Sequence, residues 1–170
     1  EDKRFDVIVV NDKEQLEKAL PTADALIVRS ATKVTKDLLG KAGAIRVIGR
    51  AGVGVDNIDQ AAATAKGAAV MNAPAGNTVA AAELTMALML SVVRRVPAAD
   101  RSMKAGEWDR KSFQGTELNG KTLGLVGAGR IGSAVGTRAR GFNMRVLAYD
   151  PHLPADRIQQ MEFEPASLEQ

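Results

Sequence analysis

Residues 121–136, KTLGLVGAGRIGSAVG, join an apolar run of strand length to a glycine-rich turn and a helical pattern of small residues. In this GxGxxG motif, Gly127 permits a tight turn, Gly129 lets a phosphate approach the backbone, and Gly132 lets the helix pack closely on the strand. The N–H groups and positive dipole end of the helix would face that phosphate. The stretch therefore predicts a strand–turn–helix unit that binds the pyrophosphate of a dinucleotide.

A second apolar run, 144–149, follows the helix and ends at Asp150. A carboxylate at this place can accept hydrogen bonds from the ribose hydroxyls and repels the 2′-phosphate of NADP, which favours NAD. The alternative is an ordinary glycine turn followed by a loop carboxylate. Arg130 is expected to face the pyrophosphate, with a solvated arginine as the alternative. The predicted cofactor-binding residues here are Gly127, Gly129, Arg130, Ile131, Gly132 and Asp150.

Apolar runs alternate with helical patterns along the chain. We expect strands at 5–10, 25–30, 45–50, 68–73, 122–127 and 144–149, and helices at 12–20, 35–42, 57–66 and 78–95, besides the helix after the glycine-rich turn. This alternation is typical of right-handed βαβ units and predicts an α/β protein with mostly parallel sheets. The segment 97–119 is polar and lacks clear periodicity, which indicates a crossing between domains.

The amino-acid composition argues against several kinds of partner and site. The chain has 170 residues, 45% hydrophobic and 25% charged, with a net charge of +3 and scattered basic residues. Few aromatic residues accompany that charge, so no nucleic-acid partner is expected. The absence of cysteine excludes disulfides and thiolate metal sites and fits a cytoplasmic protein, and no metal is expected. The longest apolar run, 84–93, is shorter than the ~20 residues of a membrane span, and no secretory signal opens the chain.

Six motifs together carry a family resemblance. In order they are LIVRSATKVT (26–35), GRAGVGVDNID (49–59), NAPAGNTVAAAELT (72–85), SMKAGEW (102–108), GTELNGKTLG (115–124) and VGAGRIG (126–132). With them the chain resembles the D-2-hydroxyacid dehydrogenase family, most closely its members that oxidise 3-phosphoglycerate in serine synthesis. The resemblance implies a flavodoxin-like parallel-sheet substrate domain joined to the first βαβ of a Rossmann NAD-binding domain, with the ligand in the cleft between them.

The same resemblance implies domain boundaries. We expect residues 1–76 to form the substrate domain without its first strand, 77–119 to form an inter-domain helix and crossing segment, and 120–170 to begin the cofactor domain. Relative to the family, the chain is expected to be trimmed at both ends.

The resemblance also implies substrate-binding residues. The loop at 50–56 matches the family loop whose N–H groups, chiefly those of Val53 and Gly54, hold the substrate carboxylate. Adjacent amides flanked by glycines can form an anion nest, and a plain glycine turn is the alternative. Val53 also lies where the family touches the nicotinamide side of the cofactor. Arg29 matches the arginine that holds the phosphate of 3-phosphoglycerate, with Ser30, Thr32 and Lys33 as candidate supplements.

Two further residues lie at the start of the long predicted helix and inside it. Asn77 matches a family position in the cleft near substrate and nicotinamide, and helix capping is its alternative role. Glu83, inside the long helix, is expected to be structural.

The base needed for oxidation is expected to lie elsewhere. Removing the hydroxyl proton of a 2-hydroxy acid takes a general base, commonly a histidine, and a cation polarises the developing carbonyl. The family takes its arginine, acid and histidine from a later part of the cofactor domain. His152 is the single histidine, and it follows Asp150 so closely that we expect it on the surface at the adenosine end. We therefore expect no catalytic residue in this chain and no activity from it alone.

Self-association is the remaining expectation. The helix at 78–95 is apolar almost all round, so most of its faces must be covered. The resemblance places it, with the Trp108 segment, at a dimer interface, and burial in a core is the alternative. Open sheet edges also predict a homodimer or a higher, intertwined homo-oligomer. The alternative functions are a non-catalytic nucleotide-binding module and a self-assembling fragment, and the alternative substrate is glyoxylate or hydroxypyruvate.

Overall fold

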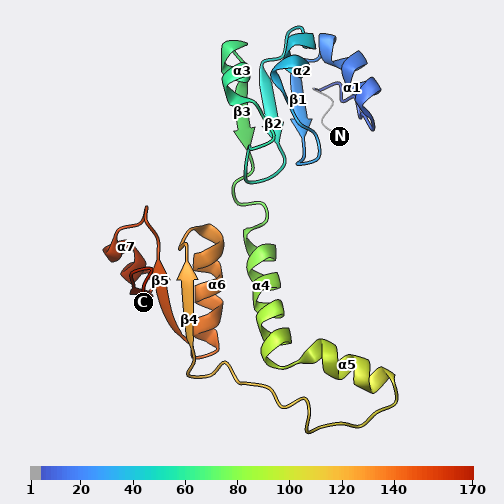
Figure 1. Cartoon of the computed structure of the whole chain (residues 1–170). Coiled ribbons are helices and arrows are strands. Elements are labelled where there is room, and N and C mark those ends of the chain that lie inside the picture. Colours follow the sequence, from blue (N-terminus) through green and yellow to red (C-terminus); the bar gives the residue numbers. More distant parts are fainter. Residues whose placement is uncertain (1–4) are drawn as a thin grey trace. The chain divides into compact units, whose positions relative to one another are not determined.

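The computed structural model describes residues 5–170 and divides at Gly76 and Asn77 into two units (Figure 1). Each unit holds one three-stranded sheet, and every strand pair in both sheets is parallel. The α/β class with parallel sheets, predicted from the alternation of apolar runs, is confirmed. No helix in the described part of the chain combines the length and the apolar character needed to cross a membrane.

The first unit alternates short helices and strands. Its elements are α1 (Lys13–Ala19), the 3-10 helix η1 (Leu20–Thr22), β1 (Ala25–Val28), α2 (Lys36–Lys41), β2 (Val47–Arg50), α3 (Gln60–Ala65) and β3 (Ala69–Asn72). The strand order is β1-β2-β3. Leu26 and Val28 are buried under the helices, whereas Ile27, on the opposite face of β1, is 79% exposed. Within the described unit, the helices thus cover one face of the sheet.

Helix starts in this unit follow from capping side chains. Asp12 Oδ1 accepts a hydrogen bond from the N–H of Gln15 at the start of α1, and Asp59 Oδ1 does the same for Ala62 in α3. Thr35 Oγ1 accepts from the N–H of Leu38 in α2. Such caps satisfy N–H groups that a helix leaves without an internal partner. Because Asp59 is the cap, α3 begins at Gln60 and not at residue 57 as predicted.

The strand predicted at 5–10 is wrong. No strand forms there, and the side chains of Val7 and Val9 are each 75% exposed. Only Val10 packs against the core of the unit. Apolar and β-branched side chains favour a strand only where a neighbouring strand gives them a paired surface to pack on. In the described residues, no strand pairs with this segment.

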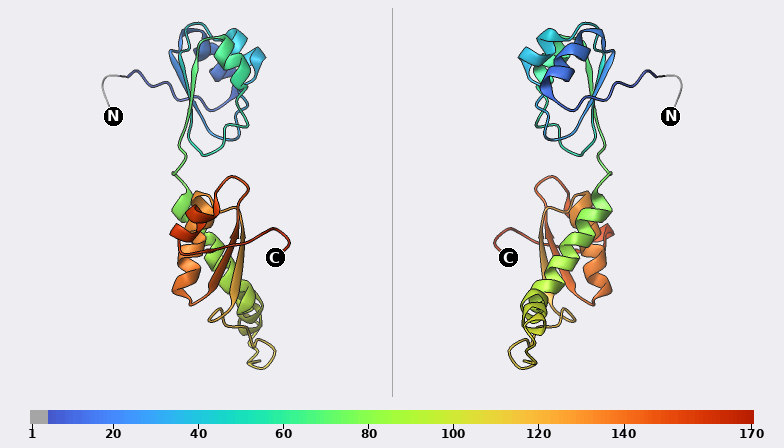
Figure 2. Two further views of the ribbon diagram at one scale, coloured as in Figure 1. Left: turned by 90° about the vertical axis from the view of Figure 1, so that its left-hand side faces the viewer. Right: turned by 90° about the vertical axis from the view of Figure 1, so that its right-hand side faces the viewer.

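The second unit contains the glycine-rich turn. Its elements are α4 (Thr78–Val93), α5 (Val96–Lys104), β4 (Thr122–Val126), α6 (Arg130–Gly141), β5 (Arg145–Tyr149), α7 (Ala155–Gln160) and β6 (Glu164–Pro165), and the strand order is β4-β5-β6. Figure 1 shows α6 between the sheet and α4, and both views in Figure 2 show α4 running along α6. Ala82 and Met86 of α4 are buried in the same core as Val135 and Ala139 of α6.

Two segments of this unit hold elements that the sequence pattern did not predict. The long helix expected at 78–95 ends at Val93, and Arg95 adopts a left-handed conformation with φ of 54°. Pro97 then sits in the first turn of α5, a position that proline tolerates because no N–H is needed there. The cofactor sheet, expected with two strands, gains a third in β6, which pairs with Leu147 and Ala148 of β5. An ion pair between Arg145 and Glu164 joins the same two strands.

Gly136 has a packing role. It lies in α6, and a glycine inside a helix costs about 1 kcal/mol relative to alanine. A β-carbon at this position would lie 2.5 Å from Phe163 Cζ and 3.0 Å from Leu125 Cδ1. Phe163 is buried in the core of the unit. The glycine therefore lets α6 approach both the sheet and the segment after α7.

Gly136→Ala should destabilise the chain. Overpacking of a closed core costs about 1–3 kcal/mol, which exceeds the gain of about 1 kcal/mol in helix propensity. Gly141→Ala is the matched control, because it lies in the same helix with no atom within 4 Å of an added β-carbon. Urea unfolding followed by circular dichroism measures both variants. Equal or higher stability of Gly136→Ala would contradict the packing role.

Candidate functional site

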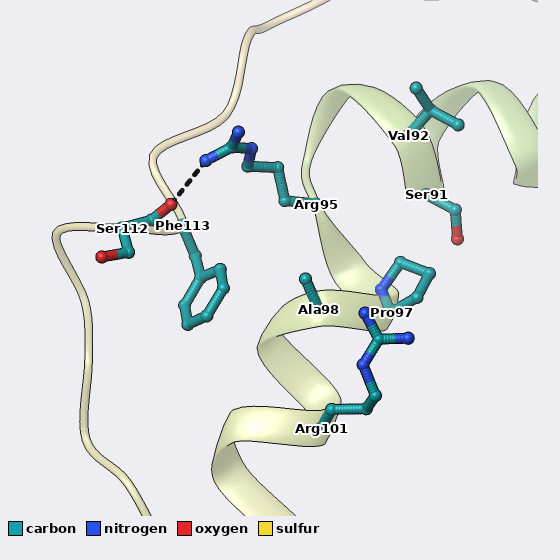
Figure 3. A pocket seen from close by; sticks show the side chains of 8 residues that line it. All are labelled: Ser91, Val92, Arg95, Pro97, Ala98, Arg101, Ser112 and Phe113. Carbon is teal, nitrogen blue, oxygen red and sulfur yellow. Dashed lines mark hydrogen bonds between the residues drawn. The ribbon is translucent and has the colours of Figure 1, made fainter.

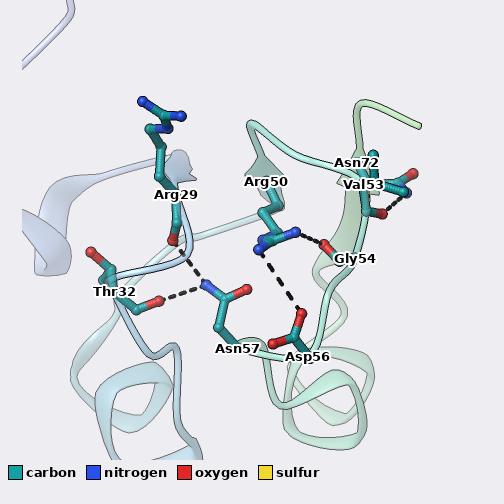
Figure 4. Close-up of polar contacts among 8 residues, drawn as sticks. All are labelled: Arg29, Thr32, Arg50, Val53, Gly54, Asp56, Asn57 and Asn72. Atoms are coloured by element: carbon teal, nitrogen blue, oxygen red, sulfur yellow. Dashed lines mark hydrogen bonds and ion pairs between the residues drawn. The ribbon is translucent and has the colours of Figure 1, made fainter. Parts of the chain in front are cut away.

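The loop at 51–56 follows β2, and its successive carbonyl groups are held by hydrogen bonds (Figure 4). The donor–acceptor pairs are Ala73 N to Gly52 O at 2.9 Å, Asn72 Nδ2 to Val53 O at 2.6 Å and Arg50 Nη1 to Gly54 O at 2.5 Å. Two donors come from the end of β3 and one from the end of β2. Neighbouring strands therefore fix the peptide planes of this loop.

The N–H groups of Val53 and Gly54 are left without an acceptor by this arrangement, whereas those of Ala51 and Gly52 donate to Val28 O and Arg50 O. In a trans peptide the carbonyl and the N–H point in opposite directions, and the described chain has no cis peptide. The N–H groups of Val53 and Gly54 therefore point away from β3, and neither donates to any group among residues 5–170. Successive free N–H groups form an anion-binding concavity. These are the two amides that the family resemblance implies for the substrate carboxylate.

Arg50 lies beneath this loop. Its side chain is only 12% exposed, and its Nη2 is 3.9 Å from Asp56 Oδ1. A β-carbon at residue 52 would lie 3.0 Å from Arg50 Nη1, and one at residue 54 would lie 2.9 Å from Asp56 Oδ1. The two glycines thus make room for the packed guanidinium and its acidic neighbour. Sequence reasoning gave Arg50 no role, although an arginine before two closely spaced glycines was a usable signal.

The loop after β1 carries Arg29. The Arg29 side chain is exposed, and within residues 5–170 it makes no hydrogen bond or ion pair. Its backbone, in contrast, is held by Asn57, whose Nδ2 donates to Arg29 O at 3.0 Å and to Thr32 O at 2.6 Å (Figure 4). An exposed cation on a fixed backbone is suited to binding an anion, because the fork of a guanidinium can hold several oxygens.

The glycine-rich turn links β4 to α6 in the second unit. Gly127 has φ of +101°, a conformation that favours glycine, and a β-carbon at Gly132 would lie 2.1 Å from Gly127 O. The helix can therefore begin immediately above the turn only if residue 132 is glycine. Among the described residues, nothing accepts a hydrogen bond from the N–H groups of Gly129, Arg130 or Ile131. Such unused groups at a helix start form a site for phosphate.

Asp150 lies beside this turn. Its Oδ2 accepts from Ala128 N at 2.9 Å, and its Oδ1 accepts from His152 N at 2.8 Å. These N–H groups, that of His152 first and that of Ala128 second, hold the pKa of Asp150 below the ordinary aspartate value. The carboxylate is therefore ionised at neutral pH. The end of β5 and the turn after β4, which lie 22 residues apart, are brought into contact.

The remaining predicted residues are placed as follows. Asn77 stands at the N-cap position of α4, yet its side chain makes no capping hydrogen bond, so the capping alternative has no support. Glu83 forms an ion pair with Arg138 of α6 at 3.7 Å, as fits a structural residue. The side chain of His152 is exposed. In the described part of the chain, no three histidine, aspartate or glutamate side chains gather as a metal site.

An apolar surface on α4 and α5 completes the candidate features. The outer face of α4 exposes Leu84, Leu88 and Val92, spaced four residues apart on one side of the helix. At the corner between α4 and α5 lies a hollow of about 460 Å³ (Figure 3). Arg95 closes one side of it by donating from Nη1 to Ser112 O at 2.6 Å. The other residues that line the hollow are Ser91, Val92, Pro97, Ala98, Arg101 and Phe113.

Several known proteins are similar to this chain in sequence and in fold. D-3-phosphoglycerate dehydrogenase of Methanocaldococcus jannaschii is 54% identical over 152 residues, which covers 89% of this chain and 29% of the relative. The human enzyme of the same name is 55% identical over 139 residues, covering 82% of this chain and 26% of the relative. The D-lactate dehydrogenase of Aquifex aeolicus, solved with NAD and lactic acid, matches with a TM-score of 0.81 and 32% identity over 90% of this chain and 46% of that one.

A family model covers nearly the whole sequence. It describes the catalytic domain of D-isomer specific 2-hydroxyacid dehydrogenases and matches residues 1–161. The chain spans less than a third of the length of the two phosphoglycerate dehydrogenases, at 29% and 26%. Because this family model matches residues 1–161 of 170, the chain belongs to the D-isomer specific 2-hydroxyacid dehydrogenase family.

Proposed function

We propose that this chain is the substrate- and NAD-binding part of a dehydrogenase that oxidises 3-phosphoglycerate to 3-phosphohydroxypyruvate. The observation that carries the proposal is a set of free N–H groups in each unit, at Val53 and Gly54 and at Gly129 to Ile131. Each set is fixed by surrounding structure and suited to an anion. The identity to phosphoglycerate dehydrogenases over most of the chain supports 3-phosphoglycerate over glyoxylate or hydroxypyruvate.

The first unit would hold the substrate. The N–H groups of Val53 and Gly54 would bind the carboxylate, and the free guanidinium of Arg29 would bind the phosphate. Asn77, which the family resemblance also assigns to substrate binding, is the first residue of the second unit. Binding both ends of the substrate would orient the hydroxyl-bearing carbon between them, which is the contribution that such residues make to catalysis.

The second unit would hold NAD. The N–H groups of Gly129, Arg130 and Ile131 would bind the pyrophosphate, with Gly127 and Gly132 allowing the close approach. The ionised Asp150 would accept from the ribose hydroxyls and disfavour the extra phosphate of NADP. When bound, NAD would supply the acceptor for the hydride that leaves the substrate.

The proton of the substrate hydroxyl needs a base that this part of the enzyme does not supply. The single histidine donates its backbone N–H to Asp150, so it belongs to the sugar end of the proposed cofactor site. We therefore assign these 170 residues to binding and orientation, and the acid–base step to the longer enzyme.

The exposed face of α4 would bind a second copy of the chain. It exposes three large apolar side chains, one of which, Val92, also lines the adjacent hollow, and exposed apolar patches mark interaction sites. A homodimer would cover both copies of the face at once, since a twofold interface uses the same patch on each subunit.

Asp150→Ala should weaken NAD binding about tenfold, which corresponds to about 1.4 kcal/mol. It should weaken NADP binding less, because loss of the carboxylate also removes a repulsion. Isothermal titration of both cofactors measures the change, and Asp156→Ala, in the first turn of α7, is the control. An unchanged preference for NAD in Asp150→Ala would remove this residue from the site.

The 170-residue chain should not reduce NAD with 3-phosphoglycerate. The expected result is no increase in NADH absorbance at millimolar substrate and cofactor, because the chain holds no histidine suited to act as the base. Measurable turnover would refute the assignment of the acid–base step to the longer enzyme.

Leu88→Glu should shift the chain toward monomer. Leu88 is 57% exposed in the middle of the apolar face, and two charges facing each other across a twofold interface would repel. Leu168→Glu is the matched control, since Leu168 is 60% exposed near the C-terminal end of the second unit. Analytical ultracentrifugation reports the mass. A wild-type monomer, or equal masses for wild type and Leu88→Glu, would contradict the proposed interface.

A further inference from the structure

We propose that Asn57 is a positioning residue that sets the spacing between the two anion-binding loops of the first unit, and so selects acids that carry a second anion at their far end. The inference rests on the proposed function, in which one loop binds the carboxylate and the other the phosphate. It concerns a residue that neither touches the substrate nor takes part in the reaction.

The amide of Asn57 joins the two loops directly. Its single nitrogen donates to Arg29 O at 3.0 Å and to Thr32 O at 2.6 Å, which lie 28 and 25 residues earlier in the sequence. Both acceptors are backbone atoms of the loop that carries the Arg29 guanidinium. A hydrogen bond to the backbone fixes the root of that side chain and leaves its charged end free for a ligand.

The backbone around Asn57 makes the same connection rigid. Asn57 O accepts from Val34 N at 2.8 Å, and Val34 O accepts from Asp59 N at 2.9 Å. Val34 and Ile58 pair as a parallel bridge, and both side chains are buried in the core. The loop after β1 therefore cannot move as a body without breaking this ladder. The Asn57 side chain in addition fixes the carbonyl groups of Arg29 and Thr32 in that loop.

On the other side, Asn57 is tied to the carboxylate loop. Ile58 N donates to Val55 O at 2.9 Å, which closes a turn from Val55 to Ile58. Asp56, the residue before Asn57, is the ionic neighbour of Arg50, and Arg50 holds Gly54 O. This turn thus connects the free amides of Val53 and Gly54 to Asn57, whose side chain holds the backbone of Arg29.

Two buried polar atoms of this framework lack a hydrogen-bond partner. In the described part of the chain, Arg50 Nε and Asn57 Oδ1 are the buried side-chain polar atoms without a hydrogen-bond partner. A buried polar atom without a partner costs folding free energy, so such atoms are rare in native structures, and a functional role is one of their explanations. Both belong to the residues that hold the two loops.

The test compares 3-phosphoglycerate with glycerate, which lacks the phosphate. Dissociation constants are measured by isothermal titration for the 170-residue wild type, Asn57→Ala, Asn57→Ser and Asn72→Ala. The wild type should bind 3-phosphoglycerate at least about tenfold more tightly than glycerate, the worth of one charge-assisted contact. Asn57→Ala should reduce that ratio to about two or less, with glycerate affinity changed less than about threefold.

Asn72→Ala is the matched control. It also removes an amide that donates to a backbone carbonyl at 2.6 Å, but this carbonyl, Val53 O, belongs only to the carboxylate loop. It should weaken both ligands by similar factors and leave their ratio unchanged. Asn57→Ser keeps one hydrogen-bond donor and should give an intermediate ratio, so it stands in if Asn57→Ala fails to fold. Unfolding curves confirm that each variant is folded.

The possible results distinguish a failure of the positioning role of Asn57 from a failure of the proposed function. A ratio near wild type in folded Asn57→Ala and Asn57→Ser would overturn the positioning role and leave the proposed function intact. If the wild type bound neither ligand, or bound both equally, the proposed phosphate site would fail, and this inference would fail with it.

Discussion

The planar trans peptide is the constraint on which the loop after β2 depends. A carbonyl held on one side sends the N–H of the same peptide to the other side. In the loop after β2, Gly52 O and Val53 O are held from the end of β3, so the amides of Val53 and Gly54 are turned outward. The remaining features of the loop, the buried guanidinium of Arg50 and the glycines that admit it, serve to keep those peptide planes in place.

The glycine-rich turn reaches the same end by a steric route. Because residue 132 has no β-carbon, α6 begins close enough to Gly127 O for its first amides to remain at the end of the sheet. Asp150 then fixes the turn through the amide of Ala128, and the two hydrogen bonds that lower its pKa also keep it charged. The same two hydrogen bonds thus fix its position and favour its ionised form. Gly136 has a similar steric role further along the helix, where the missing β-carbon makes room for Phe163.

Much of the fold followed from local pattern, because buried parallel strands are continuous apolar runs between helical segments. That rule gave β1 to β5 and placed Asp150 at the end of β5. It failed at 5–10, where the apolar run has no strand to pair with, and at β6, which is only two residues long and owes its pairing to β5. Arg50, Asn57 and Asn72 were missed because a polar side chain that holds a backbone carbonyl leaves no periodic signal, and three of their partners lie 19 to 28 residues away.

The most direct measurement is a nitrogen–proton correlation NMR titration of the 170-residue chain, first with NAD and then with 3-phosphoglycerate. The account predicts that NAD shifts the amide signals of Gly129, Arg130 and Ile131, and that 3-phosphoglycerate shifts those of Val53 and Gly54. Saturation at millimolar ligand with those five signals unmoved, or with the largest shifts elsewhere, would contradict the assignment of these free amides to anion binding.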